Sequence, residues 1–288
     1  MKNFYIAGVL LLLLGLAGCR MENLQDALSL AERHSGTLDS LIQVTQTFTP
    51  QEEHYLGKAV AAQILSRYPA LNDQKANNYL NQIGQSLALC SSQPYTYGGY
   101  HFLLLDSNEV NAFAAPDGLI FVTKGMLRLV GNESQLAAVL AHEIAHVQHK
   151  DALNAINNAR LTSVFSSIGI DAARQYTPAQ AAQLINAFSD SVNEVVETLI
   201  TKGYARSQEY DADAAACEIL ARAGYDPQGL SQVLKTMASQ VPTGSTGLGS
   251  THPSADDRLA KLPDAGDPAA VEPAARQVRF QAAMGSHL

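Results

Sequence analysis

Apolar residues recur at helical spacing in two segments of the first third of the chain. Over residues 51–68, and again over residues 78–89, apolar positions are separated by three or four residues. This spacing places the apolar side chains on one face of an α-helix. The pattern therefore predicts two amphipathic helices.

The pattern changes between residues 101 and 123. Short apolar runs at 102–105, 110–114 and 119–122 are separated by residues that favour turns. Runs of this length between turn-forming residues are typical of strands. We expect these three strands to form a small antiparallel sheet.

Helical spacing returns after the predicted sheet. Asn132 is a suitable N-cap, with Gln135 three residues later, for a long helix that we expect to continue past Lys150 toward residue 158. Further helices are predicted after Pro178 and over residues 205–223. The chain is therefore expected to have an α+β fold that is mainly helical, with the small antiparallel sheet as its β component.

The first residues have the pattern of a signal peptide, predicted over residues 1–18. Lys2 precedes an apolar run that is shorter than a membrane-spanning helix. The run ends in Leu-Ala-Gly-Cys at 16–19, which resembles the lipobox of bacterial lipoproteins, where the chain is cut before a lipid-bearing cysteine. Arg20 differs from the Asp that retains such proteins in the inner membrane of enteric bacteria. The resemblance implies a lipid anchor at Cys19, on the periplasmic side of the outer membrane. An uncleaved membrane anchor is the alternative.

The composition suits one globular domain, or two small ones, since 47% of the 288 residues are hydrophobic and 16% are charged. We predict a spacer over residues 19–50, a folded domain over 51–262 and a peripheral C-terminal tail over 263–288. Residues 242–250 are rich in Gly, Ser and Thr and predict a mobile loop.

The charge argues against nucleic acid as a partner. The chain has 27 acidic and 19 basic residues, a net charge of -8, and no cluster of Lys and Arg. Binding to a phosphate backbone needs such a cluster. Beyond Cys19 only Cys90 and Cys217 remain, and the sequence is compatible with one disulfide or with two buried thiols.

The predicted long helix carries His142-Glu143-Ile144-Ala145-His146. Residues four apart share one face of a helix, so the two imidazole rings can reach a single zinc ion. Glu143 then lies beside an open coordination position, where it can act as a general base. The pattern predicts a catalytic site with one Zn²⁺ per chain.

A zinc site for hydrolysis needs a third protein ligand. His149 lies seven residues from the first histidine of the motif, too far along a straight helix for all the rings to converge. Glu209 is the better candidate, because Asp213 follows four residues later and can hold the second ring nitrogen of a ligand histidine. Glu194 and Glu197 are the runners-up. Alternatively, the two acids of the Glu209 helix only face solvent.

Taken together, the motifs resemble the HtpX and CAAX-prenyl endopeptidase family of gluzincin metallopeptidases, over about residues 51–262. The resemblance rests on Asn111-Ala112-Phe113-Ala114, Pro116-Asp117-Gly118, His142-Glu143-x-x-His146, Glu209-x-x-x-Asp213, and His252-Pro253 through Arg258. It looks closest to the soluble periplasmic lipoproteins of that family, the BepA-like type. The transmembrane helices of integral members and the helical repeats of the BepA type are not seen in this sequence, so selection of substrates by such repeats is not expected.

The resemblance implies a zincin-like fold and a role for each matching residue. His142, His146 and Glu209 match the zinc ligands, Glu143 the general base, and Asp213 the acid behind a ligand.

Three further matches concern the substrate side of the site. His252 and Arg258 match an active-site pair near the metal. Residues 111–114 match an edge strand that aligns the substrate backbone, which would make recognition largely independent of sequence. The alternative is an ordinary sheet edge covered by another part of the chain.

The expected function is therefore zinc-dependent hydrolysis of peptide bonds in unfolded, damaged or misassembled envelope proteins. His252 could hydrogen-bond the oxyanion, or occupy the open zinc position at rest. The alternative function is a binding or assembly factor for outer-membrane proteins, with a latent zinc site and little proteolysis. A zinc hydrolase for a small molecule is a weaker third hypothesis.

Overall fold

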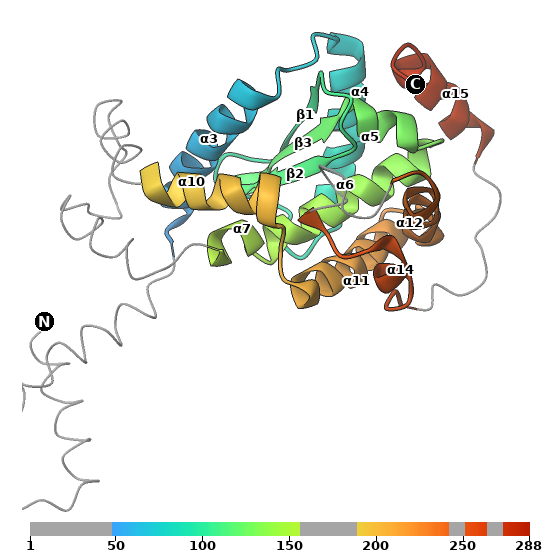
Figure 1. Ribbon diagram of the computed structural model, residues 1–288. Helices are drawn as coiled ribbons and strands as arrows, with labels where there is room; N and C mark the ends of the chain where they lie inside the picture. The colour runs from blue at the N-terminus through green and yellow to red at the C-terminus, as the bar shows by residue number, and fades with distance from the viewer. Residues whose placement is uncertain (1–47, 156–188, 242–250, 264–272) are drawn as a thin grey trace, which may run out of the picture. The chain divides into compact units, whose positions relative to one another are not determined.

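A three-stranded sheet lies between two groups of helices (Figure 1). The structure is a computed structural model that describes residues 48–155, 189–241, 251–263 and 273–288, all within one unit that begins at Phe48. The predicted signal peptide, the lipidation site and the predicted loop 242–250 lie outside the described residues. No helix in the described part is long and apolar enough to cross a membrane.

The described elements follow one another in this order: α3 (Pro50–Arg67), α4 (Gln74–Ala88), β1 (His101–Leu105), β2 (Ala112–Ala115), the 3₁₀ turn η1 (Pro116–Gly118), β3 (Leu119–Thr123), α5 (Lys124–Leu129), α6 (Glu133–Gln148), α7 (Asp151–Asn154), α10 (Ser189–Glu197), the π-helical turn η2 (Thr198–Lys202), α11 (Arg206–Arg222), α12 (Gln228–Gln240), α14 (Ala255–Leu259) and α15 (Ala274–Met284). The predicted helices before the sheet and the predicted helix over 205–223 are confirmed as α3, α4 and α11.

The predicted α+β fold, mainly helical with a small sheet, is confirmed. The sheet has the strand order β1-β3-β2 and is mixed, so only the expectation that all its strands are antiparallel was wrong. The turn η1 joins β2 directly to β3, which makes these two strands antiparallel. The segment between β1 and β2 also reverses the chain. Two reversals bring β3 back in the direction of β1, and the two pair in parallel. The sequence located the strands but not their order.

Alternate residues of the strands face opposite sides of the sheet, and both sides are buried. Phe102, Ile120 and their neighbours on one face pack with α4, α6 and α12. Phe113 and Phe121 on the other face pack with α3, α7 and α10. Burial on both sides explains why the strands read as apolar runs and not as alternating patterns.

Helix α6 is buried along nearly its whole length. It begins as predicted at the N-cap Asn132, whose side chain accepts a hydrogen bond from the Gln135 backbone N–H at 2.9 Å. It ends at Gln148, so the predicted continuation past residue 150 was wrong. Lys150 has a left-handed backbone with φ 57°, which turns the chain before the short helix α7.

The predicted peripheral tail contains a packed helix. In α15, Phe280 and Met284 are fully buried in the main core, against α4 and α6. Helix α12 also contributes buried apolar residues at helical spacing. The C-terminal region therefore takes part in the fold of the domain.

Both described cysteines are free thiols. Cys217 is buried on α11, and Cys90 packs partly buried against the same core. Burial, with a smaller contribution from the charge of Asp213, raises the pKa of the Cys217 thiol to about 11. The structure has the two-thiol arrangement and no bridge between them.

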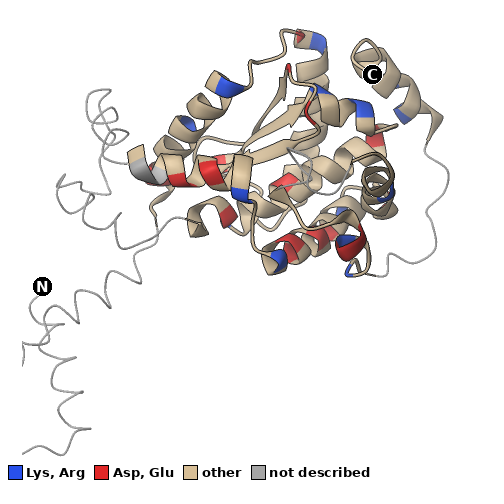
Figure 2. Cartoon of the chain, viewed as in Figure 1, with Lys and Arg blue, Asp and Glu red and all other residues tan. Residues whose placement is uncertain are grey.

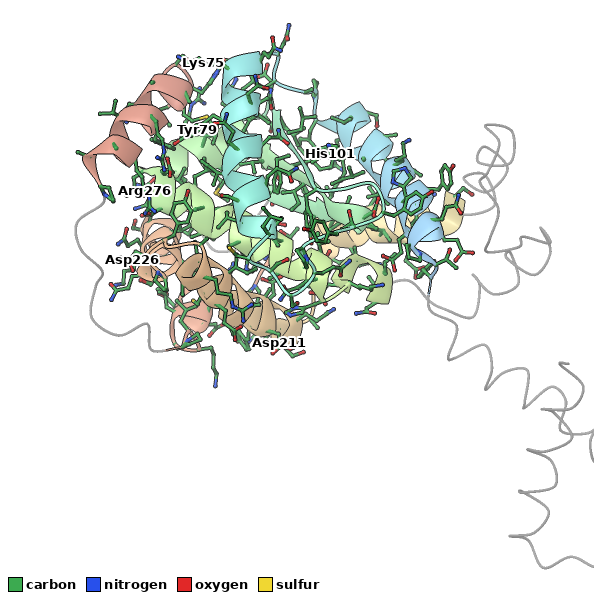
Figure 3. All side chains as sticks on the ribbon, turned by 180° about the vertical axis from the view of Figure 1, so that it is seen from behind. Lys75, Tyr79, His101, Asp211, Asp226 and Arg276 are labelled. Atoms are coloured by element: carbon green, nitrogen blue, oxygen red, sulfur yellow. The ribbon has the colours of Figure 1, made fainter. Side chains whose placement is uncertain are left out.

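A buried carboxylate ties the start of α6 to other parts of the chain. Glu133 is fully buried and accepts hydrogen bonds from the hydroxyls of Tyr79, at 2.5 Å, and Tyr225, at 2.9 Å. Arg279 donates to both of its oxygens, and Arg276 lies 3.7 Å away. Tyr79 on α4 and Arg276 on α15 appear on the same side of the molecule in Figure 3. The first turn of a helix also favours a negative charge.

Replacing Glu133 by Ala is expected to lower the free energy of unfolding by about 2–6 kcal/mol, because two buried hydroxyls lose their acceptor at about 1–3 kcal/mol each. Urea unfolding of the purified protein measures the change. The control is Glu218→Ala, which breaks an exposed pair with Arg222 on α11 and is expected to cost less than about 1 kcal/mol. Equal losses in the two variants would contradict the anchoring role of Glu133.

Candidate metal centre

Two neighbouring helices bring together the residues that the sequence predicts as metal ligands. On α6, His142 and His146 direct their Nε2 atoms at each other, 3.1 Å apart. Glu209 on α11 lies opposite, with Oε2 3.5 Å from Nε2 of His142 and Oε1 3.6 Å from Nε2 of His146. All three side chains are at most 5% exposed. Helix α11 carries most of its charged residues as acids, with Arg206 and Arg222 at its ends (Figure 2).

These three side chains fit a metal ion of the size of zinc. Zinc bonds to nitrogen are about 2.0–2.1 Å, so two tetrahedral ligand atoms lie roughly 3.3 Å apart. The separations of 3.1, 3.5 and 3.6 Å are close to this value. Glu209 Oε1 is buried and has no hydrogen-bond partner among the described residues. A buried carboxylate oxygen in that state is costly unless a cation compensates it.

The outer nitrogens of both histidines are held by carboxylates. Asp213 Oδ1 lies 2.9 Å from Nδ1 of His142, and Asp151 Oδ2 lies 2.8 Å from Nδ1 of His146. Gln208 in turn donates to Asp151 Oδ1 at 2.7 Å. A hydrogen bond at Nδ1 fixes the tautomer in which the Nε2 lone pair faces the metal and raises its basicity.

Asp151 was not predicted from the sequence. On an uninterrupted helix it would point away from His146, because five residues correspond to more than one full turn. The left-handed residue Lys150 turns the chain and brings Asp151 back. A spacing rule that assumes a continuous helix cannot find this residue.

Arg258 holds Asp213 in place. Its Nε donates to Asp213 Oδ2 at 2.9 Å and its second terminal nitrogen to Oδ1 at 2.5 Å, and the guanidinium is 3% exposed. Burial alone would raise the pKa of Asp213, but the charge of Arg258 holds this pKa well below its ordinary value. Burial and Arg258 also oppose protonation of His142, yet its hydrogen bonds to Asp213 and Glu209 raise its pKa to about 9. Arg258 is therefore a positioning residue in this structure.

His252 joins the ligand group as a fourth member. Its Nδ1 lies 2.6 Å from Glu209 Oε2, and one atom from each of His142, His146, Glu209 and His252 lies within 4.8 Å of the others. Burial lowers the pKa of His252, against the opposing charge of Glu209. Four such side chains could hold a metal ion.

The other candidates fall outside this group. His149 is the C-cap of α6, and its ring contacts the Gln148 side chain. Glu194 and Glu197 lie on α10, and neither belongs to a possible metal group in the described part of the chain. Glu143 lies beside His142 on α6 and is 3% exposed.

Strand β2 is at the edge of the described sheet. The backbone of Asn111 bonds to β3, since its carbonyl oxygen accepts a hydrogen bond from the Thr123 N–H, and Phe113 stands opposite Phe121. Bonded residues alternate along an antiparallel strand, so the backbone N–H and C=O groups of Ala112 and Ala114 point away from β3. The Ala112 N–H is taken by the Asn111 side chain at 2.9 Å. The four strand residues are at most 4% exposed, and η2 lies close by. Ala114 and His146 line the same small pocket, so the strand reaches the ligand group.

The small sheet and the helix pair with its buried ligand group constitute a zincin-like fold. Peptidase family M48 matches residues 74–265, which is more than half of the chain. The chain therefore belongs to peptidase family M48.

Curated relatives are similar over the same region. The beta-barrel assembly-enhancing protease of Escherichia coli (strain K12) is 27% identical, over 74% of this chain and 44% of that protein. The protein with the same description in Yersinia pestis is also 27% identical, over 74% of this chain and 43% of its own. The protease HtpX homolog of Burkholderia mallei (strain SAVP1) is 28% identical, over 56% of this chain and 66% of that protein. The chain thus spans less than half the length of the first two relatives.

Replacing Asp213 by Asn is expected to destabilise the metal-free protein at pH 7 by about 3–5 kcal/mol, because Arg258 stays buried without its charge partner. Since the folded pKa of Asp213 is lowered, this stabilisation is complete above the unfolded pKa of about 3.9 and is lost as the pH falls below it. Urea unfolding at pH 7 and pH 3 measures both effects. The control Asp211→Asn, exposed on the same helix, should change little. A loss for Asp213→Asn that does not depend on pH would contradict the pairing.

Proposed function

We propose that the protein is a zinc-dependent endopeptidase. The observation that carries this proposal is that two imidazole Nε2 atoms, 3.1 Å apart, face the buried carboxylate of Glu209, whose Oε1 has no hydrogen-bond partner among the described residues. His142, His146 and Glu209 would hold one zinc ion, and Glu143 would be the general base. Membership of peptidase family M48 supports this assignment.

Zinc, when bound, would lower the pKa of a bound water to about 7 and polarise the carbonyl of the scissile peptide. Glu143 accepts the proton of the attacking water and later donates it to the leaving amine. Asp213 and Asp151 keep the two histidines in the binding tautomer. Arg258 keeps Asp213 charged and in position. The burial of these groups excludes competing water from the reacting atoms.

The proposed substrates are unfolded or misassembled polypeptides of the bacterial envelope. The name of the beta-barrel assembly-enhancing proteases supports this class of substrate. A substrate segment would add to the outward backbone groups of Ala112 and Ala114, after displacement of whatever covers that edge. The proposed location is the periplasmic side of the outer membrane, with a lipid on Cys19.

A second candidate function is a binding or assembly factor with a latent zinc site. The observation that favours it is the place of His252 within the ligand group, where it could act as a fourth protein ligand. Structural zinc sites have four protein ligands, whereas catalytic sites keep one position open. The two functions differ in whether Glu143 is needed.

Glu143→Gln is expected to lower the rate of casein cleavage by about 10²–10⁴-fold, since the amide cannot accept a proton. The variant should keep roughly one zinc per chain, because Glu143 is not a ligand. Casein degradation and zinc content are measured on both proteins. Full activity in the variant would contradict the assignment of the base. A wild type that holds zinc and cleaves nothing would favour the binding factor.

His252→Ala separates the two roles of this histidine. If the ring occupies the open position at rest, its removal should raise the rate of casein cleavage by at least about tenfold. If it hydrogen-bonds the oxyanion, removal should lower kcat by about 10²–10³-fold. Initial rates at saturating substrate give the direction. An unchanged rate would count against both roles.

A further inference from the structure

The hydroxyl of Tyr204 is the second buried polar group of the site that has no hydrogen-bond partner among the described residues. Buried hydroxyls are normally paired, because an unpaired one costs free energy. The described residues have two other such groups, Asn111 Nδ2 before strand β2 and Glu209 Oε1, which the proposed metal would satisfy. Tyr204 Oη is therefore a polar atom for which the metal site alone gives no partner.

Tyr204 is held against a proposed metal ligand. Its ring lies over that of His146, with the centroids 4.4 Å apart and the planes inclined by 35°. The residue stands between η2 and α11, next to the helix that carries Glu209. This packing restricts the ring of Tyr204, and with it the hydroxyl that the ring carries.

The backbone before Tyr204 also restricts where this residue lies. Gly203 has φ 74°, a conformation that favours glycine. A Cβ on Gly203 would lie 1.7 Å from the carbonyl oxygen of Thr251, so the chain before Tyr204 passes directly against the segment that carries His252. Tyr204 is thus placed by His146 and by this close backbone approach together. Such prior placement is what electrostatic stabilisation of a transition state needs.

The hydroxyl of Tyr204 can act as a donor. A tyrosine hydroxyl has an ordinary pKa of about 10 and keeps its proton at neutral pH. Three carboxylates, those of Glu143, Asp151 and Glu209, lie around it. The carboxylates are near enough to act on it electrostatically, yet none of them forms a hydrogen bond with it.

We propose that Tyr204 Oη donates a hydrogen bond to the carbonyl oxygen of the scissile peptide as that oxygen becomes negatively charged. This inference rests on the proposed peptidase function and adds a catalytic residue to it. The proton stays on Tyr204, so no bond to the enzyme is made or broken. The polypeptide substrate would supply the partner that the hydroxyl lacks.

The test is Tyr204→Phe, which keeps the ring on His146 and removes only the hydroxyl. We expect kcat for casein to fall by about 10²–10³-fold, the effect of removing one such donor, with KM changed less than about threefold. Affinity for a phosphinic peptide, which imitates the tetrahedral oxyanion, should fall in parallel. Zinc content should stay at roughly one per chain, and the thermal midpoint should not fall, because no hydrogen bond within the described residues is lost.

Tyr225→Phe is the matched control. Its hydroxyl does have a partner, Glu133 at 2.9 Å, and lies outside the site. We expect this variant to have a lower thermal midpoint and an unchanged kcat, the reverse of Tyr204→Phe. If the wild type is active and Tyr204→Phe has an unchanged kcat, Tyr204 is only a packing residue. This result would overturn the inference about Tyr204 and leave the peptidase proposal standing. If Tyr204→Phe loses zinc, its fall in kcat comes from a disturbed His146, and this result would also overturn the inference about Tyr204. An inactive wild type would overturn the peptidase proposal and the inference together.

Discussion

The structure depends on keeping two histidine rings of one helix turned toward a common point. An imidazole that is free to rotate or change tautomer would not hold its Nε2 there. Asp213 and Asp151 remove this freedom by binding the Nδ1 atoms of His142 and His146. The first carboxylate is itself held by the buried guanidinium of Arg258. Asp213 and Arg258 thus compensate each other's charge, which lowers the cost of burying both groups.

The rest of the fold keeps helix α6 in place. The sheet packs on one side of it, and α11 and α12 on others. Glu133 joins its first turn to α4 and α15 through paired hydroxyls and arginines. At the other end, the left-handed backbone of Lys150 stops the helix where Asp151 is needed. Packing therefore fixes the position of helix α6 and its two histidines, and the end of the helix fixes the position of Asp151.

The sequence was most informative where the physical rule is local. Helical spacing predicted His142, His146 and Glu209 as ligands of one ion, and the structure brings these three side chains into one buried group. The sequence also predicted the positions of the strands. The parallel pairing of β1 with β3 depends on two chain reversals, which the pattern of a single segment does not reveal. Asp151 and Tyr204 were missed for a similar reason. One depends on a helix break, and the other on a backbone contact between Gly203 and residue 251.

The most direct test of the account is anomalous diffraction at the zinc absorption edge from crystals of the purified protein. The account predicts one strong peak per chain, within about 2.0–2.2 Å of Nε2 of His142, Nε2 of His146 and a carboxylate oxygen of Glu209. Such a peak would also show whether His252 completes the coordination or leaves a position for water. A zinc-loaded crystal with no peak between these side chains, or with the ion held elsewhere, would contradict the account.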